Sequence, residues 1–267
     1  MPLLECKNVV KRFGGLTAVN EVNIAVEQGD LAGLIGPNGA GKTTLFNLLT
    51  GVYAPTEGDI LFEGVSISGK KPYEIAQRGI GRTFQNIRLF SDLTVMDNVR
   101  TAASVRAKTG LAATVFQTAG CARIEKSVTE DAGHLLELLG LYDLRDEQAR
   151  NLPYGDQRRL EIARALATKP RLLLLDEPAA GMNPQESEDL MHLIRRLRDE
   201  FSVTILLIEH DMNVVMGVCE KITVLVYGEP IAFGTPEEIQ SNPKVIQAYL
   251  GDEDGDGVGD VGGKTDA

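Results

Sequence analysis

Short apolar runs alternate along the chain with stretches in which apolar residues recur at helical spacing. Unbroken apolar runs are typical of strands covered on both faces, and an alternation of strand and helix favours a mostly parallel sheet. The pattern therefore predicts an α/β fold. Its predicted strands are residues 31–35, 171–175, 203–208 and 222–226, and its clearest predicted helices are residues 45–49 and 184–201.

Two further regions modify this picture. Residues 4–10, 22–26 and 59–62 are apolar-rich and separated by glycine-containing turns, which predicts an added antiparallel β layer. Residues 91–155 form a predicted helical subdomain, because Ala132, Leu135, Leu136 and Leu139 follow helical spacing. Gly110 and Gly120 are predicted to divide this region into two or three helices. We expect one domain over residues 1–250.

A glycine-rich segment lies between a predicted strand and a predicted helix. It reads Gly36-Pro37-Asn38-Gly39-Ala40-Gly41-Lys42-Thr43-Thr44 and fits the pattern G-x-x-x-x-G-K-[ST]. Its backbone N–H groups can bind phosphate oxygens. Lys42 can reach the β- and γ-phosphates, and the Thr43 hydroxyl can ligate Mg²⁺. A chance glycine turn would not explain the flanking strand and helix, so these nine residues predict a nucleoside triphosphate site.

Composition restricts the classes of protein to be considered. The chain has 267 residues, 43% of them apolar, which is enough to bury the core of one large domain. A net charge of −11 argues against a nucleic-acid partner. No apolar run approaches the length of a membrane span, and we see no signal peptide. Cys6, Cys121 and Cys219 lie far apart, which favours free thiols in a reducing cytosol.

Two carboxylates end one of the predicted strands. The run Leu172–Asp176 is followed by Glu177, and the carboxyl edge of a parallel sheet is where such folds bind ligands. Asp176 is suited to hold Mg²⁺, and Glu177 is suited to polarise an attacking water. The alternative is an ordinary acidic turn, but the phosphate loop upstream favours the catalytic interpretation.

A third segment resembles a motif of a known family. The segment Leu152-Pro153-Tyr154-Gly155-Asp156, with the helical pattern after it, resembles the signature motif of ABC-transporter ATPases. Other matches follow in the family's order. The resemblance implies that Phe13 stacks on adenine, that Gln85 ligates Mg²⁺ or orients water, and that His210 bonds the γ-phosphate. It covers roughly residues 3–250 and identifies the nucleotide as ATP.

The signature departs from the common Leu-Ser-Gly-Gly-Gln pattern. Pro153 replaces the serine, so no hydroxyl can reach phosphate there, and Tyr154 replaces the first glycine. Asp156 replaces the glutamine; its charge favours the helix dipole but opposes a nearby triphosphate. We therefore expect a working but weakened contact with ATP bound to a second chain. Residues 179–184 resemble the family's D-loop, in which Asn183 replaces the usual aspartate and can still hydrogen-bond across a dimer.

The resemblance also implies partners. Two ABC ATPase subunits, either copies or relatives, enclose two ATP molecules and drive separate membrane-spanning permease subunits attached near the helical insert. Segments 82–90, 152–165, 179–184, 208–212 and 242–251 are similar to branched-chain (hydrophobic) amino acid importer ATPases, specifically the one with the longer insert. That similarity implies a peripheral location on the cytoplasmic face of the inner membrane and, indirectly, a periplasmic solute-binding protein.

Other functions remain open at this point. One is a lipid or lipopolysaccharide exporter ATPase, although its signature usually keeps the serine and glycines. Another is a soluble ABC ATPase acting on DNA or ribosomes, although these commonly carry a coiled-coil insert or two fused halves. The last 17 residues hold six acids and one lysine, and Asp252, Asp254, Asp256 and Gly257 resemble the start of a calcium loop. Gly263 stands where the loop needs glutamate, so we expect a disordered acidic tail.

Overall fold

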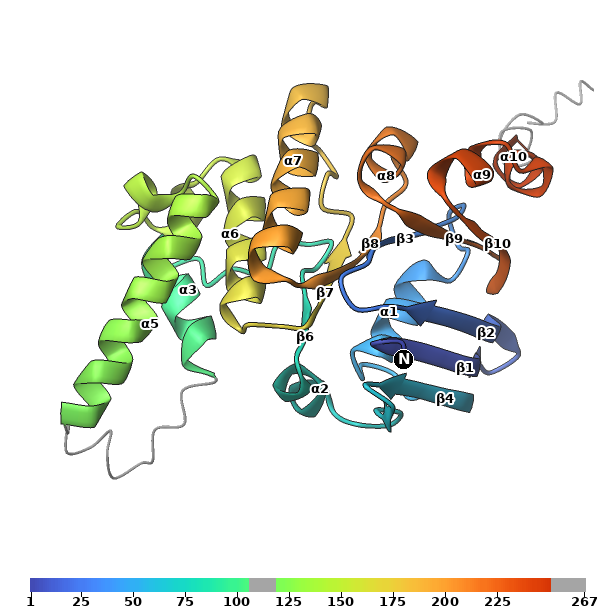
Figure 1. Ribbon diagram of the computed structural model, residues 1–267, viewed down its shortest axis with the longest axis horizontal. Coiled ribbons are helices and arrows are strands. Elements are labelled where there is room, and N and C mark those ends of the chain that lie inside the picture. The colour runs from blue at the N-terminus through green and yellow to red at the C-terminus, as the bar shows by residue number, and fades with distance from the viewer. Residues whose placement is uncertain (106–118, 251–267) are drawn as a thin grey trace, which may run out of the picture.

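A six-stranded sheet crosses the protein, and a four-stranded antiparallel sheet lies beside it (Figure 1). The computed structural model describes residues 1–105 and 119–250. The larger sheet has the order β10-β9-β3-β8-β7-β6, parallel except for β10, and the smaller has the order β2-β1-β4-β5. The strands are β1 (Leu4–Phe13), β2 (Leu16–Val26), β3 (Leu31–Ile35), β4 (Glu57–Phe62), β5 (Val65–Ser66), β6 (Ile80–Arg82), β7 (Leu172–Asp176), β8 (Thr204–Ile208), β9 (Lys221–Val226) and β10 (Glu229–Gly234).

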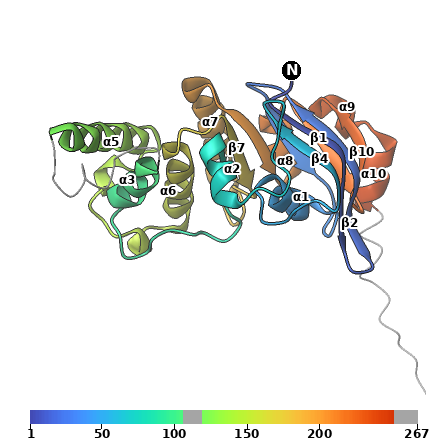
Figure 2. The ribbon, with the colours of Figure 1, turned by 90° about the horizontal axis from the view of Figure 1, so that it is seen from below.

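Helices pack against the larger sheet, and a group of helices lies beyond one of its ends and forms the helical end of the molecule. In Figure 2, α3, α5 and α6 lie at one end, and β10, α9 and α10 lie at the other. The helices are α1 (Lys42–Leu49), α2 (Pro72–Arg78), α3 (Val95–Ser104), α5 (Ala119–Leu138), α6 (Tyr154–Ala167), α7 (Pro184–Phe201), α8 (Met212–Val218), α9 (Pro236–Gln240) and α10 (Pro243–Leu250), with 3₁₀ turns at Tyr142–Leu144 and Ala149–Asn151.

The strand β7 shows how the apolar run specifies its place. Leu172 and Leu174 join one core cluster, together with α1 and the antiparallel sheet, whereas Leu173 and Leu175 join the other, with α6, α7 and α8. Successive side chains of a strand point to opposite faces. All four leucines are buried, and each contributes about 2 kcal/mol of hydrophobic stabilisation. The strand is thereby fixed in the middle of the molecule with its carboxyl end free to carry polar groups.

The predicted α/β class with an antiparallel layer is confirmed, and the differences are local. The strand predicted at 171–175 runs one residue later, and α2, β5, β6, α8, β10, α9 and α10 were not predicted. Ala132, Leu135, Leu136 and Leu139 are buried in one cluster, as their spacing predicted. Gly120 lies inside α5 rather than between helices. Gly110 and the acidic tail, residues 251–267, lie outside the described residues.

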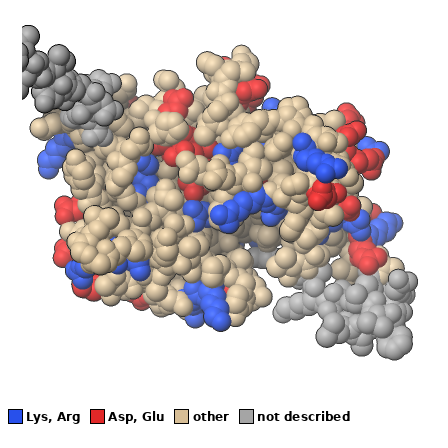
Figure 3. Space-filling model, turned by 180° about the vertical axis from the view of Figure 1, so that it is seen from behind, with Lys and Arg blue, Asp and Glu red and all other residues tan. Residues whose placement is uncertain are grey.

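Charged side chains are scattered over one face of the molecule. The face in Figure 3 carries Lys, Arg, Asp and Glu side chains mixed with a larger uncharged area. Among the described helices, none combines the length and apolar character needed to cross a bilayer.

Candidate nucleotide-binding and hydrolysis site

The phosphate loop connects β3 to α1 and lies against two other segments of backbone. Gly36 has φ 150° and Gly41 has φ 98°, a region that favours glycine. A Cβ on Gly36 would lie 1.9 Å from the Leu225 carbonyl oxygen, and one on Gly41 would lie 2.4 Å from the Ala18 carbonyl oxygen. Both glycines are therefore required for steric reasons, independently of any ligand.

Lys42 is the first residue of α1, and its ammonium group points back into the loop. Its Nζ donates to the carbonyl oxygens of Gly36 (2.5 Å) and Pro37 (2.9 Å). Burial lowers the pKa of Lys42, and the negative charge of Glu177 opposes that shift. Thr43, the next residue, is exposed. The loop thus combines a helix N-terminus, the Lys42 ammonium bonded to two carbonyl oxygens, and the accessible Thr43 hydroxyl. Together these groups suit phosphate oxygens.

Asp176 ends β7 and has a buried cationic partner. Its Oδ2 accepts a hydrogen bond from Arg82 Nη2 over 2.7 Å. The two side chains are 3% and 7% exposed. Arg82 also donates to Asn47 Oδ1 (2.8 Å) and Thr50 Oγ1 (3.0 Å) at the end of α1. This arginine therefore joins the strand of the acidic pair to the helix that follows the phosphate loop.

The three residues expected to act in catalysis lie together. Gln85 Nε2 donates to Glu177 Oε2 over 3.0 Å, and His210 Nδ1 lies 3.8 Å from the same oxygen. Glu177 has φ 47°, an uncommon conformation that costs about 1 kcal/mol or more and is found preferentially at functional sites. The Glu177 backbone N–H donates to the Ile208 carbonyl oxygen (2.9 Å). Glu177 after β7 and His210 after β8 therefore lie at the same edge of the sheet.

The donors near this edge fit Mg²⁺ in kind. A hydroxyl (Thr43), an amide oxygen (Gln85) and a carboxylate (Asp176) are the oxygen ligands that Mg²⁺ prefers. Within residues 1–105 and 119–250, no group of three His, Cys, Asp or Glu side chains could hold a metal ion. Phosphate oxygens would therefore have to complete the coordination, as is usual for Mg²⁺ with a nucleotide.

Comparison with known proteins decides the family. A family model described as "ABC transporter" matches residues 19–180, and one described as "Branched-chain amino acid ATP-binding cassette transporter" matches residues 229–255. The chain is 50% identical over 251 residues to the "High-affinity branched-chain amino acid transport ATP-binding protein BraF" of Pseudomonas aeruginosa, covering 94% of this chain and 98% of that protein. The chain belongs to the ABC transporter family. It is accordingly an ATP-binding ATPase subunit of a transporter.

Solved ABC cassettes share the fold. A nucleotide-free ATP-binding cassette from an ABC transporter superposes with a TM-score of 0.80 at 34% identity, covering 93% of this chain and 99% of that one. A dimeric bacterial ABC transporter cassette gives a TM-score of 0.74 at 26% identity, covering 87% and 98%. The similarity therefore extends through both the sheet core and the helical end.

The segment predicted to be the ABC signature, Leu152 to Asp156, lies at the start of α6. Leu152 is buried, whereas Pro153 and Tyr154 are exposed. Pro153 occupies the N-cap and makes no side-chain cap bond, so it provides no acceptor for the first N–H groups of the helix. Asp156 Oδ1 lies 3.5 Å from Arg159 Nη1, which offsets part of its charge. Gly155, which precedes Asp156, is half-buried.

The D-loop residue Asn183 caps α7. Its Oδ1 accepts from the Glu186 N–H (3.0 Å), and the Glu186 carboxylate accepts from the Asn183 N–H (2.9 Å), forming a capping box. The asparagine oxygen is thus engaged within the chain. Its amide nitrogen is the group that the expected cross-dimer contact would have to use.

Phe13 lies at the end of β1 in an exposed aromatic pair. Its ring is 5.1 Å from the Tyr53 ring, centroid to centroid, in an edge-on arrangement, and Lys11 Nζ lies 5.0 Å from its centroid. Phe13 is 40% exposed. Its ring is therefore accessible for stacking rather than buried in the core.

Sequence reasoning missed two residues of this site. Arg82 is one, and its partner is 94 residues away. Glu209 is the other: it is buried, and its carboxylate accepts from the N–H groups of Ala179 (2.8 Å) and His210 (3.2 Å). Burial raises the pKa of Glu209, and those N–H groups oppose the shift. A charged residue directly after the apolar run 205–208 was the available signal.

Proposed function

We propose that this ATPase subunit powers uptake of branched-chain or other hydrophobic amino acids through separate membrane-spanning subunits. The support is the name of the Pseudomonas aeruginosa relative and the match over residues 229–255, which lies outside the general ABC match. The observation that carries the motor function is the grouping of Gln85, Glu177 and His210 at the sheet edge beside the phosphate loop.

In the proposed reaction, Glu177 accepts a proton from the water that attacks the γ-phosphorus, and the bond from that phosphorus to the β–γ bridging oxygen breaks, so that ADP leaves. Gln85 orients that water and the Glu177 carboxylate, and His210 donates a hydrogen bond to a γ-phosphate oxygen. Lys42 and the loop N–H groups hold the β- and γ-phosphates. Thr43, Asp176 and Gln85 would hold Mg²⁺, which neutralises developing charge when bound.

The proposed working unit contains a second ABC ATPase subunit, either a copy or a relative. Residues Leu152 to Asp156 of one chain would contact ATP on the phosphate loop of the other, with Asn183 near the boundary. The dimeric bacterial cassette supports such pairing. Phe13 and its neighbour Tyr53 would flank the adenine.

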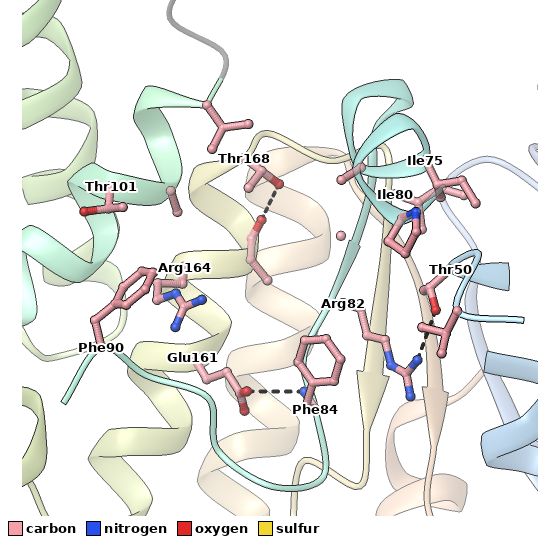
Figure 4. A pocket seen from close by; sticks show the side chains of 17 residues that line it. Thr50, Ile75, Ile80, Arg82, Phe84, Phe90, Thr101, Glu161, Arg164 and Thr168 are labelled. Atoms are coloured by element: carbon pink, nitrogen blue, oxygen red, sulfur yellow. Dashed lines mark hydrogen bonds between the residues drawn. The ribbon is translucent and has the colours of Figure 1, made fainter. Parts of the chain in front are cut away.

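A cavity of about 350 Å³ is lined by residues of the sheet core and of the helical end. Figure 4 shows Ile75, Ile80 and Thr50 on one side of it, with Phe90 and Thr101 on the other. It lies between the sheet core and the helical end, next to the segment that carries Gln85. We propose that a short apolar segment of a membrane-spanning subunit binds here, with this chain on the cytoplasmic face of the inner membrane. A periplasmic solute-binding protein would deliver the amino acid.

Transport assays test this proposal. The chain would be purified with its permeases and second ATPase, reconstituted in vesicles with a solute-binding protein, and supplied with labelled leucine. ATP-dependent accumulation that is lost in the Glu177→Gln variant is expected. ATP hydrolysis that no hydrophobic amino acid stimulates would overturn the proposed substrate class. For the docking site, Phe90→Asp should weaken permease association, whereas Phe233→Asp, at an exposed phenylalanine of β10, should not.

A further inference from the structure

Three side chains of α6 form one continuous row along the helix. Tyr154, Arg158 and Glu161 stand at spacings of four and three residues, which places them on the same face. Arg158 Nε donates to the Tyr154 hydroxyl over 3.2 Å, and Arg158 Nη1 donates to Glu161 Oε2 over 3.3 Å. The row therefore begins in the signature segment and runs inward along the helix.

Arg158 binds the backbone that carries Gln85. Its Nη1 donates to the Phe84 carbonyl oxygen over 2.7 Å, and its Nη2 donates to the Gln85 carbonyl oxygen. The side chain is 3% exposed. A buried guanidinium forms such bonds with a fixed, forked geometry that an ammonium cannot reproduce.

Glu161 binds the same segment through its N–H groups. Its Oε1 accepts from the N–H groups of Phe84 and Arg88, each over 3.3 Å. Its side chain is 5% exposed. A buried ion pair persists only where its remaining hydrogen-bonding groups are satisfied, and here residues 84–88 satisfy them. Helix α6 therefore binds both carbonyl groups and N–H groups of the segment that carries Gln85, and this fixes the position of Gln85.

The outer end of the row touches the D-loop. A Cβ on Gly181 would lie 3.4 Å from Tyr154 Cε1, so the tyrosine ring lies against that glycine. The inner end leads, through the Gln85 side chain, to Glu177 at 3.0 Å. One row of contacts thus joins the surface that would face a partner's ATP to the carboxylate at this chain's own site.

We propose that Arg158 and Glu161 are positioning residues that couple the two ATP sites of the assembly. When the signature segment closes on the partner's nucleotide, α6 and residues 84–88 move together, so the contact of Gln85 with Glu177 responds to the state of the partner's site. Tyr154 stands in place of a glycine because its hydroxyl and ring anchor the outer end of the row. The inference rests on the two-chain arrangement of the proposed function.

The test compares variants within the complete transporter. Arg158→Met, Arg158→Lys and Glu161→Gln would be assayed for ATP hydrolysis against ATP concentration, with Arg196→Met as control because Arg196 is an exposed arginine of α7. We expect kcat to fall roughly tenfold to a hundredfold through misplacement of Gln85, and the Hill coefficient to fall to about 1. The KM should stay within about twofold, since the phosphate loop is untouched. Arg158→Lys should restore kcat in part.

The outcomes separate this inference from the proposed function. If the wild-type assembly shows no cooperative hydrolysis, the two-chain arrangement itself fails. If the wild type is cooperative and the variants keep its kcat and Hill coefficient, the coupling role is wrong and Arg158 and Glu161 are structural. Should the Arg158 variants fail to fold, Glu161→Gln still removes the charge that binds the N–H groups of Phe84 and Arg88; unchanged kcat and cooperativity in that variant would overturn the proposal.

Discussion

Arg82 and Asp176 form a buried ion pair in which Nη2 donates to Oδ2 over 2.7 Å. The pair joins β6 to β7 directly beneath the predicted catalytic carboxylate. Because Arg82 also bonds Asn47 and Thr50, it holds the acidic edge of the sheet at a fixed distance from α1. The Arg82 guanidinium, which lies next to the predicted Mg²⁺ ligand Asp176, therefore helps to hold the site in place.

Arg82→Met should leave Asp176 buried without its partner. We expect a loss of about 3 kcal/mol in the free energy of unfolding, measured by urea denaturation. The control is Arg12→Met, which breaks an exposed pair with Glu57 and should cost less than about 1 kcal/mol. Equal losses in the two variants would show that the buried Arg82–Asp176 pair contributes no more to stability than the exposed pair.

Glu177→Gln should preserve ATP binding and slow hydrolysis by about a hundredfold or more, because an amide cannot accept the proton of the attacking water. ATP should then trap a dimer, visible by size-exclusion chromatography. Since Gln85 and His210 both lie near Oε2, the substitution retains the shape of the site. Normal hydrolysis in this variant would exclude Glu177 as the base.

Asp156→Gln removes a negative charge from the signature segment. ATP hydrolysis by the assembly should stay the same or rise by about twofold, since a partly screened charge at an accessible site is worth less than about 1 kcal/mol. Arg159, which lies 3.5 Å from Asp156, already offsets part of the repulsion. A large loss of activity would mean that the carboxylate contributes positively.

Gly36→Ala should abolish nucleotide binding or prevent folding, because the new Cβ would lie 1.9 Å from the Leu225 carbonyl oxygen. Gly15→Ala is the matched control: its Cβ would meet nothing within 4 Å. Fluorescent-nucleotide titration, together with the melting temperature, distinguishes lost binding from lost folding. Intact binding in Gly36→Ala would show that the loop can move away from β9.

Cys6 and Cys219 should resist alkylation in the folded protein. Burial raises the pKa of each thiol from 9.0 to about 12, with nearby carboxylates adding to the shift. The folded state therefore retains the proton more strongly, and stability should fall as pH rises above about 9, where the unfolded thiols ionise. In a Cys121→Ser variant at pH 8, iodoacetamide should react more than about a hundredfold slower than after denaturation.

Local patterns predicted the framework of this protein well. The β7 run was recognisable because a strand covered on both faces must be apolar throughout, and the phosphate loop because its glycines are required within nine residues. The strand β6 escaped notice because three residues carry too little pattern. The strand β10 contains Pro230, which an edge strand tolerates but which argues against a strand in sequence.

Long-range polar pairing could not be predicted in the same way. Arg158 contacts carbonyl groups 73 and 74 residues away, and nothing in the local sequence of α6 identifies those partners. Asn183 was expected to reach across a dimer, but the capping box that engages its oxygen is encoded locally by Glu186 three residues later. Only the three-dimensional structure shows that α6 and residues 84–88 bind each other.

The backbone at Gly36 and Gly41 lies so close to neighbouring carbonyl groups that no side chain fits at either position. This limits which parts of a nucleotide the loop can recognise. A loop that meets its ligand through backbone N–H groups and one lysine reads phosphate oxygens, which every nucleotide shares. In the proposed site, discrimination among bases would fall to the aromatic rings of Phe13 and Tyr53 beside the loop, and stacking distinguishes bases weakly. A change of nucleotide preference would therefore have to come through that margin, while the loop stayed as it is.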